Sequence, residues 1–298
     1  MKHCRKTSWS LAFILIGLVW LAGPMPAQAQ DEHTHLALPD DSAAEALGWL
    51  LGTQTYTFNR FTFFEALDMA HRVGLKYVEA FPGQRISPEI EGTMGAGMTA
   101  AQIELVKRKL AETGIKVTAF GVVGLSADEA ESRKIFEWCK TMGVQVINTE
   151  VDRAAFDTIE KLCKEYKIKV GLHNHPKPSI YWNPDTIVEA LEGRSEWLGA
   201  CADTGHWLRS DLNPVECLKK LDGKIVSMHF KDLNKSGSEA HDVPWGEGVG
   251  NVPGIIAEMK RQEFKGPISV EYEHNWLNSL PEVGQCVQNF HRLTTELK

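Results

Sequence analysis

Carboxylate and imidazole side chains follow several short, largely apolar runs of this sequence, at the point where each run ends. The run over residues 198–202 ends in Asp203, and the run over residues 225–228 ends in His229. Short apolar runs bounded by turn residues are typical of strands that are buried on both faces of a parallel sheet. Because the carboxyl ends of parallel strands meet at one edge of the sheet, we expect these side chains to lie close together.

Two further apolar runs end in acidic residues, Glu150 and Glu271. Together with Asp203 and His229 they form a mixed set of oxygen and nitrogen ligands on four strand ends. Such a set suits one divalent ion, which could be Mn²⁺, Mg²⁺, Co²⁺ or Zn²⁺. A single Asp or His after a strand more often only caps a turn, so the prediction of a metal site depends on the four residues together.

Other polar residues at these strand ends are expected to line a substrate pocket: His173, His175, His206 and Lys231. In the spacing Asp203-x-x-His206 the histidine side chain can reach the same edge of the sheet as the aspartate. His173 and His175 flank Asn174 close to the end of their predicted strand, where the regular alternation of side chains between the two faces stops. Pro176 ends that strand, which leaves open which of the two reaches the pocket.

The apolar runs alternate with amphipathic stretches from Trp49 to the C-terminus. Asn183 and Asn213 each precede a proline, which is typical of the start of a helix. The predicted strands are Leu50–Thr55, Tyr77–Ala80, Lys116–Phe120, Val144–Thr149, Lys169–His173, Leu198–Asp203, Ile225–His229 and Ile268–Glu271.

Strand–helix units of this number and spacing match the α/β fold of the (β/α)₈ barrel, or TIM barrel, which takes about 250 residues. An open doubly wound sheet is the alternative, but no G-x-G-x-x-G motif follows the first strand. We therefore predict a single barrel domain over residues 48–298.

The first 29 residues have the pattern of a secretory signal peptide. Lys2, Arg5 and Lys6 precede an apolar stretch over residues 11–22, and Ala27-Gln28-Ala29 offers a small-residue cleavage site. An uncleaved membrane anchor is the alternative, but the apolar stretch is short for a membrane span. We therefore expect an exported, periplasmic protein without membrane attachment after cleavage, in which a polar linker over residues 30–47 precedes the barrel.

The charge of the chain argues against some classes of partner. Removing residues 1–29 takes away three of the 32 basic residues and none of the 39 acidic ones, which leaves a net charge of −10. A strongly acidic protein is a poor match for nucleic acid or for an anionic membrane. The remaining cysteines are odd in number and lack C-x-x-C spacing, so we interpret them as buried thiols: Cys139, Cys163, Cys201, Cys217 and Cys286.

Four segments resemble the xylose-isomerase-like barrel superfamily, and the resemblance extends over about residues 48–295. This superfamily includes sugar phosphate isomerases and epimerases, ketose 3-epimerases, inosose dehydratases and apurinic endonucleases. The segments are Asp203-Thr-Gly-His206, Ser227-Met-His-Phe-Lys-Asp232, His241-Asp-Val-Pro-Trp-Gly-Glu-Gly248 and Gly266-Pro-Ile-Ser-Val-Glu271.

The resemblance implies roles for individual residues. In ketose 3-epimerases one metal ion is held by Glu, Asp, His and Glu, which match Glu150, Asp203, His229 and Glu271, and the two glutamates also act as acid and base. The resemblance also implies substrate contacts for His206 and for His241. Two departures from the family pattern affect substrate orientation and the ligand set: His173-Asn-His175 stands where many relatives have Glu-Asn-His, and Lys231 stands near the place of a substrate-binding arginine.

The predicted chemistry begins with loss of a proton from the carbon next to a carbonyl, which gives an enediolate that a divalent ion stabilises. Return of the proton epimerises or isomerises the sugar, whereas loss of a β-oxygen makes the enzyme a lyase or, in reverse, a hydratase. We therefore predict an isomerase or epimerase acting on a non-phosphorylated keto sugar, because sugar phosphates are scarce outside the cytoplasm. The alternatives are a lyase or hydratase for 3-keto-glycosides and a non-catalytic sugar-binding barrel. Barrels of this kind often form a homo-oligomer, and the sequence leaves the oligomeric state open.

Overall fold

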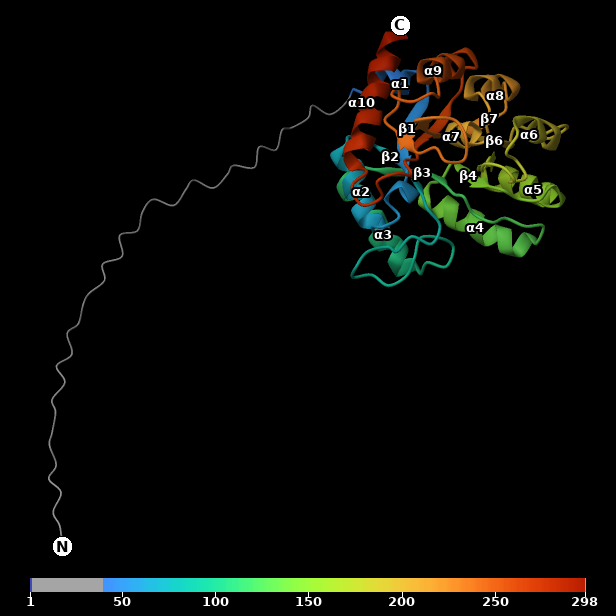
Figure 1. Cartoon of the computed structure of the whole chain (residues 1–298). Coiled ribbons are helices and arrows are strands. Elements are labelled where there is room, and N and C mark those ends of the chain that lie inside the picture. The colour runs from blue at the N-terminus through green and yellow to red at the C-terminus, as the bar shows by residue number, and fades with distance from the viewer. Residues whose placement is uncertain (2–39, 298) are drawn as a thin grey trace. The chain divides into compact units, whose positions relative to one another are not determined.

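Eight parallel strands close into a barrel in the computed structural model, which describes residues 40–297 together with Met1 (Figure 1). The strands follow one another around the barrel in the order β1-β10-β7-β6-β5-β4-β3-β2. This arrangement confirms the predicted TIM barrel. The strands are β1 (Trp49–Gln54), β2 (Tyr77–Ala80), β3 (Lys116–Phe120), β4 (Val146–Thr149), β5 (Lys169–His173), β6 (Leu198–Asp203), β7 (Ile225–Phe230) and β10 (Gly266–Val270).

Helices connect the strands and surround the barrel (Figure 1). The side chains of Asn183 and Asn213 accept hydrogen bonds from backbone N–H groups of the first turn, as expected for a capping residue before a proline. The helices are α1 (Ser42–Ala46), α2 (Phe63–Arg72), α3 (Ala100–Thr113), α4 (Glu129–Met142), α5 (Phe156–Tyr166), α6 (Pro184–Ala190), α7 (Thr204–Arg209), α8 (Pro214–Lys220), α9 (Val252–Arg261) and α10 (Leu280–Glu296), with 3₁₀ turns η1 (Thr55–Phe58) and η2 (Arg153–Ala155).

Apolar and polar residues occupy different parts of the barrel. One large apolar cluster includes strand residues such as Ile147 and Val170 and helix residues such as Phe136 and Leu162. Inside the barrel, by contrast, polar side chains bond to one another, because strand residues alternate between the inner and outer face. At Gly171 an added Cβ would lie 2.6 Å from Asn148 Oδ1, so the polar interior leaves no room for a larger residue there.

The N-terminal predictions fall only partly on the described residues. The predicted signal peptide and the linker up to residue 39 lie outside them, apart from Met1. The last part of the predicted linker contains helix α1, and the Asp41 carboxylate just before it lies 2.9 Å from Lys76 Nζ and 3.0 Å from His291 Nε2. Among residues 40–297 no helix is both long and apolar enough to cross a membrane.

A short antiparallel pair, β8 (Asp232–Leu233) and β9 (Asp242–Val243), follows β7 at the carboxyl end of the barrel. The buried Asp232 carboxylate accepts hydrogen bonds from the backbone N–H groups of Leu233 at 3.0 Å, Gly246 at 2.9 Å, Gly248 at 2.9 Å and Gly250 at 2.8 Å. This one side chain therefore fixes the loop between β9 and α9.

Replacing Asp232 by Ala should lower the free energy of unfolding by about 3 kcal/mol, because two buried and two partly buried N–H groups lose their acceptor. Urea unfolding followed by circular dichroism measures this change. Asp232→Asn keeps one acceptor oxygen and should lose less. If the alanine variant is as stable as the parent, the loop does not depend on this carboxylate.

Candidate functional site

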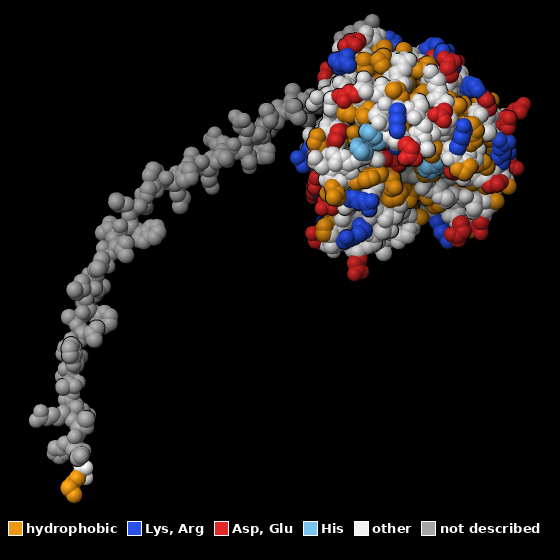
Figure 2. Space-filling view, in the orientation of Figure 1, with side chains coloured by type: hydrophobic (Ala, Val, Ile, Leu, Met, Phe, Trp, Pro, Cys, Tyr) orange, Lys and Arg blue, Asp and Glu red, His pale blue; other side chains and the backbone are white. Residues whose placement is uncertain are grey.

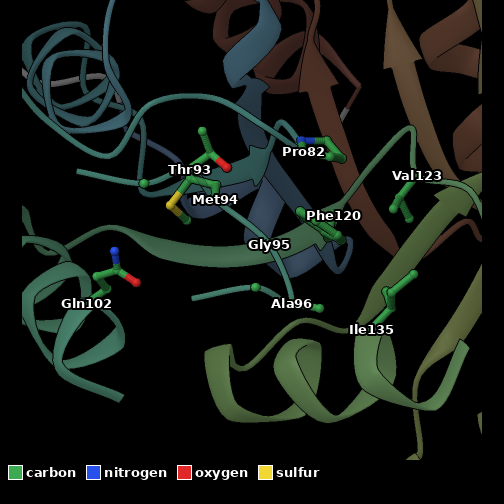
Figure 3. Close-up of a pocket in the computed structure, with 11 residues that line it drawn as sticks. Pro82, Thr93, Met94, Gly95, Ala96, Gln102, Phe120, Val123 and Ile135 are labelled. Atoms are coloured by element: carbon green, nitrogen blue, oxygen red, sulfur yellow. The ribbon is translucent and has the colours of Figure 1, made fainter. Parts of the chain in front are cut away.

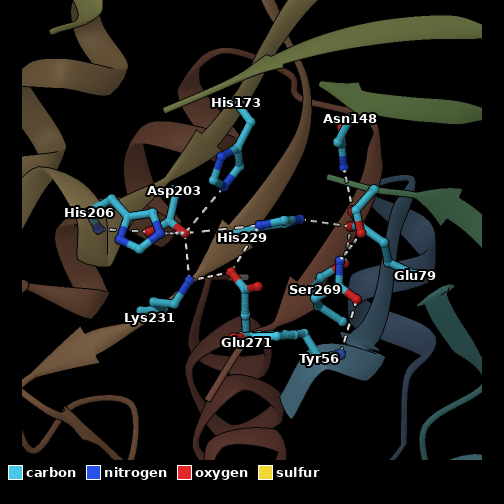
Figure 4. A network of polar contacts seen from close by, with 12 residues as sticks. Tyr56, Glu79, Asn148, His173, Asp203, His206, His229, Lys231, Ser269 and Glu271 are labelled. Carbon is cyan, nitrogen blue, oxygen red and sulfur yellow. Dashed lines mark hydrogen bonds and ion pairs between the residues drawn. The ribbon is translucent and has the colours of Figure 1, made fainter. Parts of the chain in front are cut away.

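Four buried side chains bring potential metal ligands together at the carboxyl end of the barrel. One ligand atom from each of His173, Asp203, His229 and Glu271 lies within 4.8 Å of the others (Figure 4). They come from the end of β5, the end of β6, β7 and the residue just after β10. Three of these residues belong to the predicted ligand set, and the fourth, His173, was predicted as a substrate contact. Glu150 belongs to a second group of potential ligands, with His173 and His175.

The donor atoms of this group surround a common space. His173 Nε2 lies 3.6 Å from Asp203 Oδ2, and His229 Nδ1 lies 3.9 Å from the same oxygen and 3.0 Å from Glu271 Oε2. Both ring nitrogens of His173 and Nδ1 of His229 are buried and have no hydrogen-bond partner in the part of the chain that the structure describes. A buried polar atom without a partner costs about 1–3 kcal/mol, so these nitrogens are suited to binding a cation. The residues present therefore fit a divalent metal ion.

The electrostatics favour the cation-binding forms of His173 and Asp203. For His229, burial alone would lower the pKa, but Cys201, Glu79 and Glu271 raise it. Burial lowers the pKa of His173 and outweighs the opposite effect of Asp203, so its ring stays neutral with a free lone pair. Burial alone would raise the pKa of Asp203, but His206 and Lys231 hold it well below its ordinary value. A neutral imidazole and an ionised carboxylate are the forms that coordinate metal ions.

Lys231 lies among the carboxylates, not at the rim of the pocket. Its side chain is fully buried, and Nζ lies 2.5 Å from Asp203 Oδ2 and also contacts Glu271 Oε2 (Figure 4). Burial alone would lower the pKa of Lys231. The carboxylates of Asp203, Glu271 and Glu273 have the larger, opposite effect, so the pKa is raised. The ammonium group and a metal ion would therefore share the same two oxygens.

Glu150 lies beside this group and is paired with residues of the loop after β5. Its Oε1 accepts hydrogen bonds from the His175 N–H and from Ser179 Oγ, each at 2.8 Å, and lies 2.9 Å from His175 Nδ1. Burial alone would raise the pKa of Glu150, but the bonds from His175 and Ser179 lower it to about 2. The side chains of Glu150 and His175 are 23% and 46% exposed, so both remain accessible from solvent.

The two other predicted substrate contacts lie in different surroundings. His206 is buried, and its Nε2 lies 3.5 Å from Asp203 Oδ2, while its backbone N–H donates to Asp203 Oδ1 at 2.7 Å. His206 therefore lies beside the four clustered residues. His241 is exposed and stacks on His274 with 4.4 Å between the ring centroids. None of the described side-chain contacts of His241 is with the four clustered residues.

Sequence reasoning missed two residues of the site. Glu79 of β2 is buried inside the barrel, with Oε2 2.9 Å from His229 Nε2 (Figure 4). The signal for it was present, because a Glu within an apolar strand needs a partner. Arg209 of α7 lies 3.2 Å from His206 Nδ1, contacts Glu273 and lies 2.9 Å from Asp242 Oδ2. It stands three residues after His206, on the same helix face.

Glu79 orients His229. A carboxylate accepts hydrogen bonds, so His229 Nε2–H donates to Glu79 and leaves Nδ1 directed toward Asp203 and Glu271. Replacing Glu79 by Gln should weaken binding of Mn²⁺ by about 10- to 100-fold, measured by calorimetry. Ser269 Oγ also bonds Glu79 Oε2, at 3.0 Å, without touching the imidazole, so Ser269→Ala is the matched control and should change the affinity much less. Equal affinity of Glu79→Gln and the parent would contradict this role.

A cavity of about 350 Å³ opens at the same end of the barrel, beside β2 and β3 (Figure 3). Its wall is largely apolar and includes Met94, Phe120 and Ile135, together with the glycine-rich segment 92–97. Phe120 precedes Gly121, where an added Cβ would lie 3.0 Å from Glu79 Oε1. The end of β3 therefore has the cavity wall at Phe120 and Glu79 close to Gly121, while none of the four clustered residues lines the cavity.

Comparisons with known proteins agree with this architecture. A solved structure of an uncharacterized protein from Parabacteroides distasonis ATCC 8503 is 33% identical and covers 82% of this chain and 99% of its own, with a TM-score of 0.67. A xylose isomerase-like TIM barrel protein from Mycobacterium smegmatis in complex with magnesium is 15% identical (83% and 97% covered, TM-score 0.65). A D-allulose 3-epimerase from Methylomonas sp. is 13% identical (82% and 98% covered, TM-score 0.64).

No protein with a curated description matches the chain. The family model described as "Xylose isomerase-like TIM barrel" matches residues 67–290, which is most of the barrel. Together with the 33% identity over nearly the whole length of the Parabacteroides protein, this match establishes the family. The chain belongs to the xylose isomerase-like TIM barrel family.

Proposed function

We propose that the protein is a divalent-metal-dependent isomerase or epimerase that acts on a non-phosphorylated keto sugar. The observation that carries the proposal is the buried group around Asp203, His229 and Glu271, whose carboxylates and unpartnered imidazole nitrogens fit a cation, next to the accessible carboxylate of Glu150. A divalent ion bound there would supply positive charge for the oxygens of a ketone and its neighbouring hydroxyl. Its fourth ligand is either Glu150, as the family resemblance implies, or His173.

Glu150 is suited to take the proton from the carbon next to the carbonyl. All its described contacts, from the His175 N–H and ring and from Ser179, go to Oε1. They hold the carboxylate in place and leave Oε2 free to accept a proton from substrate. Glu271 is oriented in a similar way, because Lys231 and His229 both contact its Oε2. In the proposed reaction Glu271 handles the proton on the other face of the substrate.

The charges at the mouth support a neutral substrate. Lys231 is paired with Asp203 and Glu271, and Arg209 with Asp242 and Glu273. Each of these two cations is already neutralised by carboxylates, so neither is free to bind a phosphate group. Figure 2 shows Lys and Arg side chains interspersed with Asp and Glu on the face in view, with no continuous basic patch. A sugar without phosphate needs no such patch.

The cavity beside β2 and β3 favours one alternative, a lyase or hydratase for 3-keto-glycosides. Its apolar wall could take a group attached to the sugar, which a free monosaccharide would not need. A purely sugar-binding barrel is less consistent with the site, because binding alone would not need both Glu150 and Glu271. Export to the periplasm and assembly into a homo-oligomer are further parts of the proposal; the export part is based on the sequence of residues 1–29.

Proton exchange followed by NMR tests the proposal. The Mn²⁺-treated mature protein is incubated in D₂O with free ketoses and 3-keto-glycosides, with Mn²⁺ removed before the spectra are recorded. Deuterium entering a carbon next to the carbonyl would support the proposed chemistry and identify the reacting carbon. Loss of the attached group from a 3-keto-glycoside would favour the lyase. Tight sugar binding without exchange would instead favour the binding barrel. If the protein shows no binding and no exchange, keto sugars are excluded as its substrates.

A further inference from the structure

His173 is the least satisfied polar side chain of the site. It is the last residue of β5, its side chain is 1% exposed, and neither ring nitrogen has a hydrogen-bond partner. Asn174, the next residue, bonds the backbone of Asp203 in both directions, at 2.8 and 2.9 Å, and so fixes the end of β5 against the end of β6. The backbone at the end of β5 is therefore held in place, while the ring nitrogens of His173 find no partner among residues 40–297.

The spacing of the donor atoms fits one ion. His173 Nε2, Asp203 Oδ2, His229 Nδ1 and Glu271 Oε2 have neighbouring separations of 3.6, 3.9 and 3.0 Å. An ion with bonds of about 2.0–2.2 Å to nitrogen and oxygen holds neighbouring ligand atoms about 3.0–3.5 Å apart. The three separations lie in or close to this range, and the ion would share Asp203 Oδ2 and Glu271 Oε2 with the ammonium group of Lys231.

Glu150 lies on the other side of the His173 ring. Its Oε1 is 3.9 Å from His173 Nδ1, whereas Nε2 of the same ring faces Asp203. The compact group of four does not include Glu150, which is grouped instead with His173 and His175. Its Oε1 is already bonded to Ser179 and His175. To join the ion, the Glu150 carboxylate would have to reach past the imidazole of His173.

We propose that His173 takes the place of Glu150 in the metal site, so that two imidazoles and two carboxylates hold the ion: His173, Asp203, His229 and Glu271. This inference deepens the proposed function and rests on it, because it assigns the ligands of the same site. Glu150 and His175 then stay outside the metal sphere, where they face the substrate and can transfer its proton. The two glutamates therefore differ in one respect: Glu271 is a ligand as well as an acid–base group, whereas Glu150 acts as a base outside the metal sphere.

Binding of Mn²⁺ alone, without any sugar, tests this assignment. We expect His173→Asn to weaken Mn²⁺ binding at least about 10-fold in calorimetry, because a ligand is lost. His175→Asn is the matched control, with the same substitution two residues away, and Glu150→Gln removes the competing ligand. Both should keep the affinity within about 3-fold. Pulsed EPR of the Mn²⁺-loaded parent should show coupling to two imidazole nitrogens, and this measurement does not depend on the folding of any variant.

The opposite pattern would overturn the assignment. If Glu150→Gln loses affinity while His173→Asn keeps it, and the parent shows only one coupled nitrogen, then Glu150 is the ligand, although the proposed function can still hold. If the parent binds no Mn²⁺, the assignment fails together with the metal-dependent part of the proposed function. Tight binding through two imidazoles, without proton exchange on any keto sugar, would support the assignment and refute only the proposed reaction.

Discussion

Replacing Glu271 by Gln is expected to abolish proton exchange, with a loss of about 10³-fold or more in rate. The substitution keeps the shape of the side chain but removes the negative charge that contacts Lys231 and faces His229 Nδ1. Groups that transfer protons in the transition state each contribute about 10²- to 10⁴-fold, and here the carboxylate would also be a metal ligand. The rate of deuterium incorporation into the keto sugar measures the effect.

Glu150→Gln provides an informative comparison with Glu271→Gln. It should also abolish exchange, because the free Oε2 of Glu150 is the proposed base, but it should leave Mn²⁺ binding nearly unchanged, whereas Glu271→Gln should weaken binding as well. Glu263→Gln is the control, since Glu263 is exposed and precedes β10 at the opposite end of the barrel. Activity retained in either site variant would contradict a mechanism that uses two carboxylates.

Replacing Lys231 by Met is expected to destabilise the chelator-treated protein by about 3 to 5 kcal/mol. The buried ammonium lies 2.5 Å from Asp203 Oδ2 and also contacts Glu271, and Met fills a similar volume without charge. Loss of the ammonium group leaves two buried carboxylates without their main counter-ion. A buried charge without a partner is strongly destabilising, more so than replacement of the whole ion pair by apolar residues. Urea unfolding with and without EDTA measures the change.

Mn²⁺ should stabilise the Lys231→Met variant more than the parent, because no ammonium group then shares the two oxygens. The exposed Lys235, four residues later, gives the control Lys235→Met, which should stay within about 0.5 kcal/mol of the parent. If Lys231→Met is as stable as the parent in EDTA, the ion pairs around Lys231 do not contribute to folding. If Mn²⁺ stabilises it no further, ammonium and metal do not compete.

The sequence by itself determined the barrel and the end of the barrel at which the site lies. Each of the eight predicted strands is present, with ends shifted by a few residues at most, because the period of apolar residues is a local property that each segment carries alone. Asp203 and His229 end or nearly end their strands, and Glu150 and Glu271 directly follow theirs. In a closed parallel barrel all such positions lie at one end, whatever the details of packing.

Only the tertiary structure decided which of these residues meet. Which histidine of the β5 end points inward was open from the sequence, and the structure buries His173 and leaves His175 46% exposed. The pairing of Glu79 with His229 spans 150 residues, and Lys231 lies between two carboxylates from other strands. Such contacts depend on the twist and stagger of the strands and on loop conformation. These set distances of a few ångströms between distant segments, and no local pattern of residues encodes them.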